Sequence, residues 1–267
     1  MMDPIKIIVA VATHKPYRMP CDAVYLPVHV GAELHPDVCQ EMQSDNEGDN
    51  ISNRNDSYCE LTALYWLWKN TDVDAKGLVH YRRHLGSLNR RRRRAKDPFN
   101  RLVTGDELRQ LLSRYQAVVA KRRKYYIETV YSHYSHTFDG VQFDKCREIL
   151  EEMYPEYLAA WDELMQSRSA HVFNMFVMRA ELFDAYCSWL FPILDELVRR
   201  VDTSSYDAFA NRYVGRVSER LLDPWLKVNA IDYIELPVVS PEPVDWCSKI
   251  KGFLAAKFLG KKYERSF

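Results

Sequence analysis

Short runs of apolar residues in this chain end abruptly in polar residues, which is the pattern of buried strands. The run 5–12 is rich in β-branched residues and stops at Thr13-His14-Lys15-Pro16. A continuous apolar run of this length is typical of a strand covered on both faces, as in a parallel sheet. The same reasoning predicts strands at residues 25–30, 76–81, 117–120, 172–178 and 231–236.

Between these runs, apolar residues recur at the spacing of amphipathic helices. The range 58–70 has them at positions 58, 61, 64, 65 and 68, with Asn55 or Ser57 as the expected cap. Thr104 and Glu107 have the spacing of a capping box. Helices are therefore predicted at 58–70, 104–115, 143–153, 180–201 (kinked at Pro192) and 213–228. Residues 43–57 are predicted to form a loop, and 90–100 a mobile loop.

Strands that alternate with helices predict an α/β fold, with a mostly parallel central sheet flanked by helices. We expect a single domain over residues 1–240 and a basic tail over 241–267. In the tail, Ile250, Phe253 and Phe258 recur at helical spacing among lysines. A basic amphipathic helix of this kind suits an anionic membrane surface, although it could equally dock on the protein.

Composition narrows the function classes. The 267 residues carry 37 basic and 37 acidic side chains, so no long-range field recruits nucleic acid. None of the six cysteines forms a CxxC pair, which argues against zinc and favours reduced thiols in a cytosolic protein. We find neither a signal peptide nor an apolar stretch of about 18 residues. The expected location is the cytoplasm, with contact to the inner face of the membrane as a further expectation.

Two of the predicted strands end in dense polar clusters. One cluster is Thr13-His14-Lys15, and the other is His80-Tyr81-Arg82-Arg83. Ligands of open α/β sheets bind at the carboxyl ends of strands, and arginine binds phosphate in a bidentate manner. These clusters therefore predict a diphosphate site, with surface salt bridges as the alternative for any single arginine.

Three weaker clusters accompany them. Asp49, Asn50 and Asn55 could read a nucleobase or ribose, or could simply serve loop and capping chemistry. His133 and His136, with Asp139 nearby, could hold a metal, contact sugar hydroxyls or pack a helix.

The remaining cluster is Glu219, which lies among Arg212, Arg216 and Arg220. These cations should keep Glu219 ionised. An ionised carboxylate is suited to deprotonate an acceptor hydroxyl, and a structural ion pair is the alternative.

These residues together resemble a bacterial family of capsule and O-antigen glycosyltransferases that was long catalogued as a domain of unknown function. The resemblance spans residues 5–228 and is strongest in two blocks. These blocks are Tyr58-Cys-Glu-Leu-Thr62 and Gly77-Leu-Val-His-Tyr-Arg-Arg83.

The resemblance implies a fold similar to the GT-A class and a nucleotide-diphosphate-sugar donor, with UDP-galactose or its furanose form as the leading candidate. Asn174 falls where the GT-A class often places acceptor or donor-sugar contacts. We also expect Glu60 among the donor-binding residues and Arg216 among the acceptor or sugar contacts. The GT-A class usually ends a central strand in Asp-X-Asp, which binds a divalent metal. Here that strand ends in His80 to Arg83, which argues against Mg²⁺ or Mn²⁺ without excluding it.

We therefore expect Arg82 and Arg83 to neutralise the leaving diphosphate in place of a metal. The expected acceptor is a saccharide, carried on a membrane lipid. The run Arg90–Arg94 could be a lid over the donor, a contact to lipid phosphates or a surface loop. A non-catalytic protein that binds carbohydrate or nucleic acid is the alternative function.

Overall fold

The computed structural model describes residues 5–242, so the basic tail expected over 241–267 lies outside the described residues except for its first two positions. Among these residues, seven strands form one central sheet in the order β10-β6-β9-β4-β1-β2-β3. Their bounds are β1 Ile7–Thr13, β2 Tyr25–His29, β3 Gln43–Ser44, β4 Ala75–His80, β6 Ala117–Ala120, β9 Phe176–Arg179 and β10 Tyr233–Leu236. Two short pairs lie outside this sheet: β5 (His84–Leu85) with β11 (Val238–Val239), and β7 (Arg123–Lys124) with β8 (Ser169–Ala170).

The sheet is mostly parallel, which confirms the predicted fold class. β1 pairs in parallel with β2 and β4, and β6 pairs in parallel with β10. The exception is β9, which runs antiparallel between β4 and β6. Gly77 of β4 pairs with Val177, and a Cβ on Gly77 would lie 2.7 Å from the carbonyl oxygen of Phe176. A glycine is therefore required where β9 passes β4.

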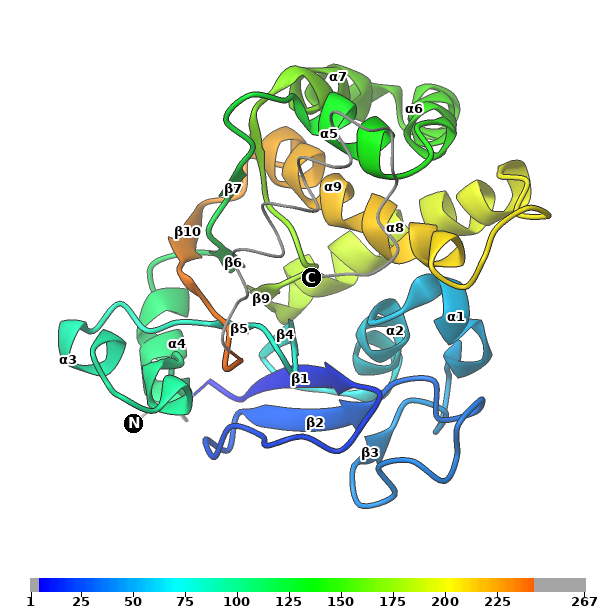
Figure 1. Cartoon of the computed structure of the whole chain (residues 1–267). Coiled ribbons are helices and arrows are strands. Elements are labelled where there is room, and N and C mark those ends of the chain that lie inside the picture. Colours follow the sequence, from blue (N-terminus) through cyan, green and yellow to red (C-terminus); the bar gives the residue numbers. More distant parts are fainter. Residues whose placement is uncertain (1–4, 243–267) are drawn as a thin grey trace.

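Helices cover both faces of the sheet because alternate side chains of each strand point to opposite sides. Ala10 and Ala12 of β1 belong to the core shared with α2 (Leu61–Asn70), α8 (Ala180–Arg200) and α9 (Tyr213–Val228). Val9 and Val11 instead belong to a second core, shared with α4 (Gly105–Leu112). Figure 1 shows α4 on one side of the strands and α2 and α8 on the other.

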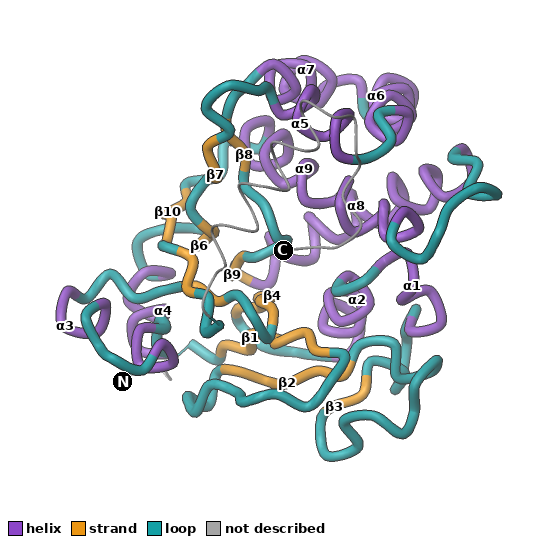
Figure 2. Tube along the Cα trace, viewed as in Figure 1, coloured by secondary structure: helices purple, strands orange, loops and turns teal. Residues whose placement is uncertain are grey.

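A layer of helices extends the larger core beyond the sheet. It contains α5 (Val130–Thr137), α6 (Val141–Met153) and α7 (Leu158–Gln166), which pack against one another, with α6 contacting α8 and α7 contacting α9 (Figure 2). Neither α5 nor α7 was predicted from the sequence. No helix within residues 5–242 is both long enough and apolar enough to cross a membrane.

Two predicted segments differ from the structure around the first helix. The predicted helix 58–70 is divided into α1 (Asn55–Tyr58) and α2 by Cys59, whose φ of +53° breaks the helical path. Neither Asn55 nor Ser57 caps α2, because its N-cap residue is Glu60 and makes no side-chain capping bond. The 43–57 segment contains β3, α1 and a 3₁₀ turn at Ser52–Arg54, so it is not purely loop.

Two further differences lie later in the chain. The 90–100 segment was predicted as a mobile loop, but it contains a short helix, α3 (Arg90–Arg93), whose cap is the side chain of Asn89. β9 begins at Phe176 and not at Val172, since Phe173 and Asn174 have φ of +77° and +49°. The capping box of Thr104 and Glu107 and the helix 213–228 are confirmed, and Pro192 lies inside α8.

Candidate functional site

The carboxyl ends of β1 and β4 form the place where the chain reverses its direction across the sheet. From β1 the chain moves outward to β2 and β3, and it then returns to β4 on the other side of β1. Loops diverge at such a topological switch point and leave a crevice for ligands. Because β9 is antiparallel, the residues just before it reach the same edge, where Phe176 pairs with both Leu78 and Val119.

Tyr81 is the centre of the first group of side chains at this edge. Its buried ring makes edge contacts with His14 and Tyr17, at centroid distances of 5.3 and 5.1 Å. Lys15 Nζ lies 5.4 Å and the Arg82 guanidinium 5.3 Å from the centre of the same ring. The two predicted clusters, 13–15 and 80–83, are thus brought together.

Hydrogen bonds to backbone carbonyls hold the side chains of Thr13 and His80 in these clusters. The Thr13 hydroxyl donates to the carbonyl of Lys15 at 2.6 Å, and His80 Nε2 is hydrogen-bonded to the carbonyl of Phe173. Burial lowers the pKa of His14, and the neighbouring Arg212, Lys15 and Arg82 lower it further. His14 is therefore expected to be neutral near pH 7, which leaves the positive charge here to lysine and arginine.

Arg83 lies deeper, with its guanidinium 4.4 Å from the centre of the Phe173 ring. Its pKa is lowered first by burial and next by the charge of Arg82, while Glu219 and Glu60 act in the opposite direction. Two guanidinium groups held close together in a partly buried position favour an anion between or beside them. Arg83 is thus brought near both Glu219 and Glu60.

Asn174 ties three elements together beneath this group. Its Nδ2 donates to Glu60 Oε1 at 2.7 Å and to the carbonyl of Gly215 at 3.1 Å. Its Oδ1 accepts from the Ser218 hydroxyl at 3.1 Å. These bonds occupy the amide of this buried residue, so it positions the start of α2 against the start of α9. The positive φ of Asn174 and of Cys59 places two unusual backbone conformations beside the site.

The N-cap and the first half of α9 supply more guanidinium groups. Arg212 Nε contacts Cys59 Sγ at 3.3 Å, and Arg216 lies between the rings of Phe138 and Phe209, at 4.1 and 4.3 Å. Burial, together with Glu60, raises the pKa of the Cys59 thiol to about 11, so it is protonated at neutral pH.

Glu219 and Arg220 are the next pair on α9. Arg220 Nη1 donates to Glu219 Oε2 at 2.7 Å, and Arg220 Nη2 donates to the Tyr125 hydroxyl at 3.2 Å. Two buried donors of this helix, Arg216 Nη1 and Arg220 Nε, have no hydrogen-bond acceptor in the structure of residues 5–242. Buried cationic donors without an acceptor are costly, and an anionic ligand would satisfy them.

A histidine pair adjoins this cluster through Tyr125. The ring of His133 lies 4.6 Å from the ring of Tyr125. His133 Nδ1 and His136 Nδ1 each lie 2.8 Å from an oxygen of the buried Glu128 carboxylate. Asp139, the carboxylate expected to accompany the pair, accepts from the Tyr206 hydroxyl at 2.8 Å. Within the described part of the chain, no group of three or more His, Cys, Asp or Glu side chains is placed to hold a metal ion.

The third predicted cluster is not brought to this edge as a unit. Asp49 accepts from Tyr65 and its backbone N–H donates to Asn70, at the end of α2 opposite Glu60. Asn50 bonds within its own loop, to the carbonyls of Asn46 and Gly48. Asn55 lies nearer, where its Nδ2 donates to the carbonyl of Cys59 at 2.7 Å and supports the break between α1 and α2.

Sequence reasoning missed several residues of this region. Arg123 lies among the groups whose charge affects Arg83 and His133, and its guanidinium is 5.3 Å from the Tyr125 ring. Glu128, the partner of both histidines, was also missed. The signal for Arg123 was the basic stretch Lys121–Lys124 directly after a predicted strand, and Glu128 had none.

A buried ion network reinforces the same edge. Asp223 Oδ1 lies 2.6 Å from His171 Nδ1 and pairs with Arg122, and His171 Nε2 lies 3.2 Å from Glu235. Burial alone would raise the pKa of Asp223, but the hydrogen bond and charge of His171 and the charge of Arg122 outweigh it and lower the pKa. This network fixes the segment that leads to Phe173 and Asn174.

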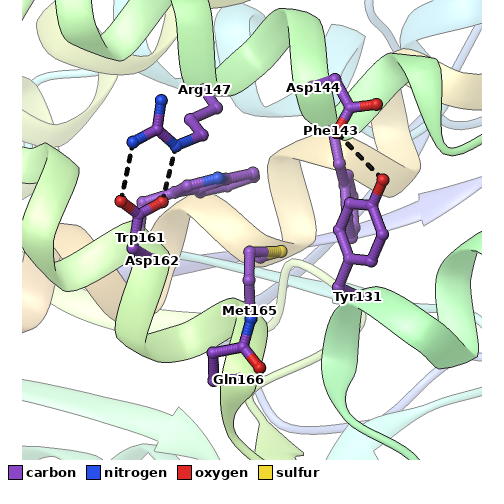
Figure 3. A pocket seen from close by; sticks show the side chains of 8 residues that line it. All are labelled: Tyr131, Phe143, Asp144, Arg147, Trp161, Asp162, Met165 and Gln166. Carbon is purple, nitrogen blue, oxygen red and sulfur yellow. Dashed lines mark hydrogen bonds and ion pairs between the residues drawn. The ribbon is translucent and has the colours of Figure 1, made fainter.

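A separate hollow of about 280 Å³ lies among α5, α6 and α7 (Figure 3). Its apolar side chains include Phe143, Trp161 and Met165. Arg147 and Asp162 form a double hydrogen bond at its edge, at 2.8 and 2.9 Å. Its lining shares no residue with the arginine cluster, so the hollow is not part of the candidate site.

Comparisons with known proteins show which family and which solved structure this chain is similar to. Residues 6–230 match the model of a family described as a domain of unknown function, DUF4422. The chain belongs to this family. The apo structure of the WbbM bifunctional glycosyltransferase is similar to this DUF4422 chain, with a TM-score of 0.79 and 28% sequence identity. The match covers 88% of this chain and 45% of the WbbM chain, so this chain spans less than half of that protein.

The similarity supports the GT-A-like fold that the sequence predicted for this DUF4422 chain. A comparison with curated proteins finds no match.

Proposed function

We propose that this chain is a glycosyltransferase that moves a sugar from a nucleotide-diphosphate donor to a saccharide acceptor. The observation that carries the proposal is the convergence of arginines at the switch point of the sheet. Six of them come from three separate segments: Arg82, Arg83, Arg123, Arg212, Arg216 and Arg220. Glu60 and Glu219 are the carboxylates interspersed with them. A cationic site with few carboxylates suits a diphosphate leaving group. The similarity to WbbM, whose name describes a glycosyltransferase, gives independent support.

The proposed reaction follows from this charge distribution. The acceptor hydroxyl oxygen attacks the anomeric carbon, and the bond from that carbon to the diphosphate oxygen breaks. The diphosphate leaves with the electron pair, and Arg82 and Arg83 stabilise the negative charge that develops. Glu219 accepts the hydroxyl proton. Arg220, which is hydrogen-bonded to Glu219, holds the carboxylate in place.

We propose UDP-galactose or UDP-galactofuranose as the donor, a preference that rests on the family resemblance. The acceptor is a growing cell-surface polysaccharide on a lipid carrier, as in capsule or O-antigen assembly. His133 and His136 then contact acceptor hydroxyls, since Glu128 orients both rings and His133 lies beside Tyr125, which accepts from Arg220. Thr13, His14, Lys15, His80 and Tyr81 would line the donor side of the site.

A thermal-shift screen tests donor binding. UDP should raise the melting temperature of the protein because it binds only the folded state, whereas a DNA oligonucleotide should not. Stabilisation by the oligonucleotide and not by UDP would favour a nucleic-acid-binding protein.

A hydrolysis assay tests catalysis. The purified chain is incubated with a panel of nucleotide sugars, and UDP release is measured with EDTA and with added Mg²⁺ or Mn²⁺. Release of UDP from one donor supports the proposal, and the effect of EDTA shows whether the arginines suffice without a metal. No release from any donor, with or without an acceptor extract, would contradict the transferase.

A further inference from the structure

The turn between β7 and α5 exposes two large apolar side chains next to each other. Tyr126 and Ile127 are 78% and 67% exposed, the highest values among the large apolar residues recorded as exposed in residues 5–242. They follow β7, which is labelled in Figure 1. Exposed apolar side chains are ordinary when they occur singly, but an adjacent pair at a projecting turn requires an explanation.

The backbone forces this exposure. Tyr126 has a φ of +56°, and the N–H of Ile127 donates to the carbonyl of Tyr125 at 2.6 Å. A hydrogen bond from residue i+2 back to residue i around a positive φ is a γ-turn of the rare, strained kind. A bulky aromatic residue seldom adopts this conformation.

The residues on either side of the turn are held in the protein. Tyr125 is buried and accepts a hydrogen bond from Arg220, and Glu128 is buried between His133 and His136. Tyr126 and Ile127 are therefore presented to solvent by neighbours that belong to the candidate site. Backbone strain that the surroundings enforce in this way is found where a protein engages a ligand.

The surroundings of the turn are basic. Lys121 and Lys124 precede it, and Arg168 lies against it, with Nη1 donating to the carbonyl of Tyr126 at 3.4 Å. All three side chains are exposed, and none forms an ion pair with another residue of the described range. The net charge of the whole protein is zero, so this positive charge is a local feature.

We propose that Tyr126 and Ile127, flanked by Lys124 and Arg168, insert into the headgroup layer of an anionic membrane. We call these four residues the tip. Tyrosine is favoured at the boundary between headgroups and acyl chains, and isoleucine just below it. Lysine and arginine beside them pair with anionic lipid phosphates.

Other occupants fit the same residues less well. A surface that binds a saccharide through the ring of Tyr126 would have acidic or amide side chains near that ring to bond the sugar hydroxyls. The neighbours of Tyr126 are instead Ile127 and the cationic Lys124 and Arg168. Two apolar side chains bury too little area for a stable contact with a second copy of the chain, which needs roughly 800 Å² on each partner.

The consequence for catalysis rests on the proposed function. If the acceptor is carried on a membrane lipid, the tip holds the site at the surface where that acceptor lies. Tyr125 and Glu128 link the tip directly to Arg220 and the histidine pair, so the docked turn and the acceptor side of the site are adjacent.

Vesicle flotation tests the tip directly. The full chain is mixed with phosphatidylcholine vesicles and with vesicles that also contain phosphatidylglycerol. We expect the wild type to float with the anionic vesicles, and binding to decrease as salt is added. The double variant Y126S/I127S should lose at least roughly tenfold in affinity for the anionic vesicles, because it loses the inserted apolar surface. V198S, which removes a 41% exposed valine from α8, is the matched control and should bind as the wild type does.

Two more variants separate the alternatives. K124E/R168E should lose binding to anionic vesicles. Replacement of Arg91, Arg93 and Arg94 of the α3 region by alanine tests whether that exposed arginine run is the anchor instead. If Y126S/I127S floats as the wild type does, or if only the α3 variant fails to float, the proposal is wrong.

The outcome is separable from that of the transferase proposal. Y126S/I127S should keep the wild-type response to UDP in the thermal-shift assay, and flotation needs no turnover. Normal flotation of Y126S/I127S with a specific loss of activity on a soluble acceptor would overturn membrane insertion in favour of a saccharide contact at Tyr126. If flotation depends on the tip but the protein binds no nucleotide, membrane insertion by the tip is supported and the proposed function is contradicted.

Discussion

The side-chain amide of Asn174 donates to Glu60 at 2.7 Å and joins two segments that lie 114 residues apart. Through this bond the start of α2 and the residues before β9 meet the first turns of α9, whose Gly215 carbonyl accepts from the same nitrogen. The arginines of α9 and those after β4 are thereby held at one edge of the sheet.

The junction itself can be tested by replacing Asn174. N174A should lower the free energy of unfolding by about 1–3 kcal/mol, because buried partners lose their hydrogen bonds. N174G should retain about 1 kcal/mol more than N174A, since glycine adopts the φ of +49° without penalty. Urea unfolding measures both values. Equal stabilities for the two variants would show that the backbone conformation contributes nothing.

Arg82 is expected to stabilise the leaving diphosphate. R82A should lower turnover roughly 100- to 1,000-fold, the usual cost of removing one donor to a developing negative charge. It should also weaken the thermal shift produced by UDP. The matched control is R91A, which removes an exposed arginine of α3. Equal losses in both variants would mean that Arg82 acts only through general charge.

Glu219 is the expected base. E219Q should lower turnover roughly 100- to 10,000-fold while UDP still stabilises the protein, because the amide can no longer accept a proton. The companion variant is E60Q, at the carboxylate that Asn174 holds. Donor hydrolysis and transfer rates are measured for both. If E219Q is active and E60Q is inactive with UDP binding intact, the proton acceptor is Glu60.

The buried network of Asp223 should make the fold sensitive to acid. The folded pKa of Asp223 lies below its ordinary value, so its ion pairs stabilise the fold above about pH 4 and are lost as the pH falls through the folded pKa. D223N should cost about 3 kcal/mol at neutral pH and should flatten the fall in stability below about pH 4. Urea unfolding across a pH series measures this. D106N, at an exposed aspartate of α4, is the control, and an unchanged acid slope in D223N would contradict the prediction.

Local patterns in the sequence were enough for the elements that build the sheet. The run after Asp3-Pro4 and the run that ends in His80 are buried strands because each is short and mostly apolar, and they pair as β1 and β4. The helix Tyr213–Val228 and the capping box at Thr104 also follow from short-range spacing. The polar residues at two predicted strand ends, 13–15 and 80–83, lie together in the structure, since parallel strands share an edge.

Other features required the tertiary structure. α5 was missed because its polar residues, including His133 and His136, hide the helical pattern, and its partner Glu128 is a single residue with no motif. The break at Cys59 and the delayed start of β9 follow from positive φ values that only long-range contacts enforce. The same applies to the turn at Tyr126, whose neighbours are anchored by Arg220 and the histidine pair.

The sequence by itself therefore determined most strands of the sheet, the helices α2, α4, α6, α8 and α9 and the two basic strand ends, because these depend on burial and spacing within a few residues. It indicated neither β3, α5 and α7 nor the antiparallel direction of β9. The tertiary structure alone decided which distant side chains complete the site. It brought Arg123 and Glu219 toward Arg83, with Arg216 and Arg220 beside Glu219, and it kept Asp49 at the far end of α2. Contacts of this kind arise from how helices pack on a finished sheet, and no short-range pattern records them.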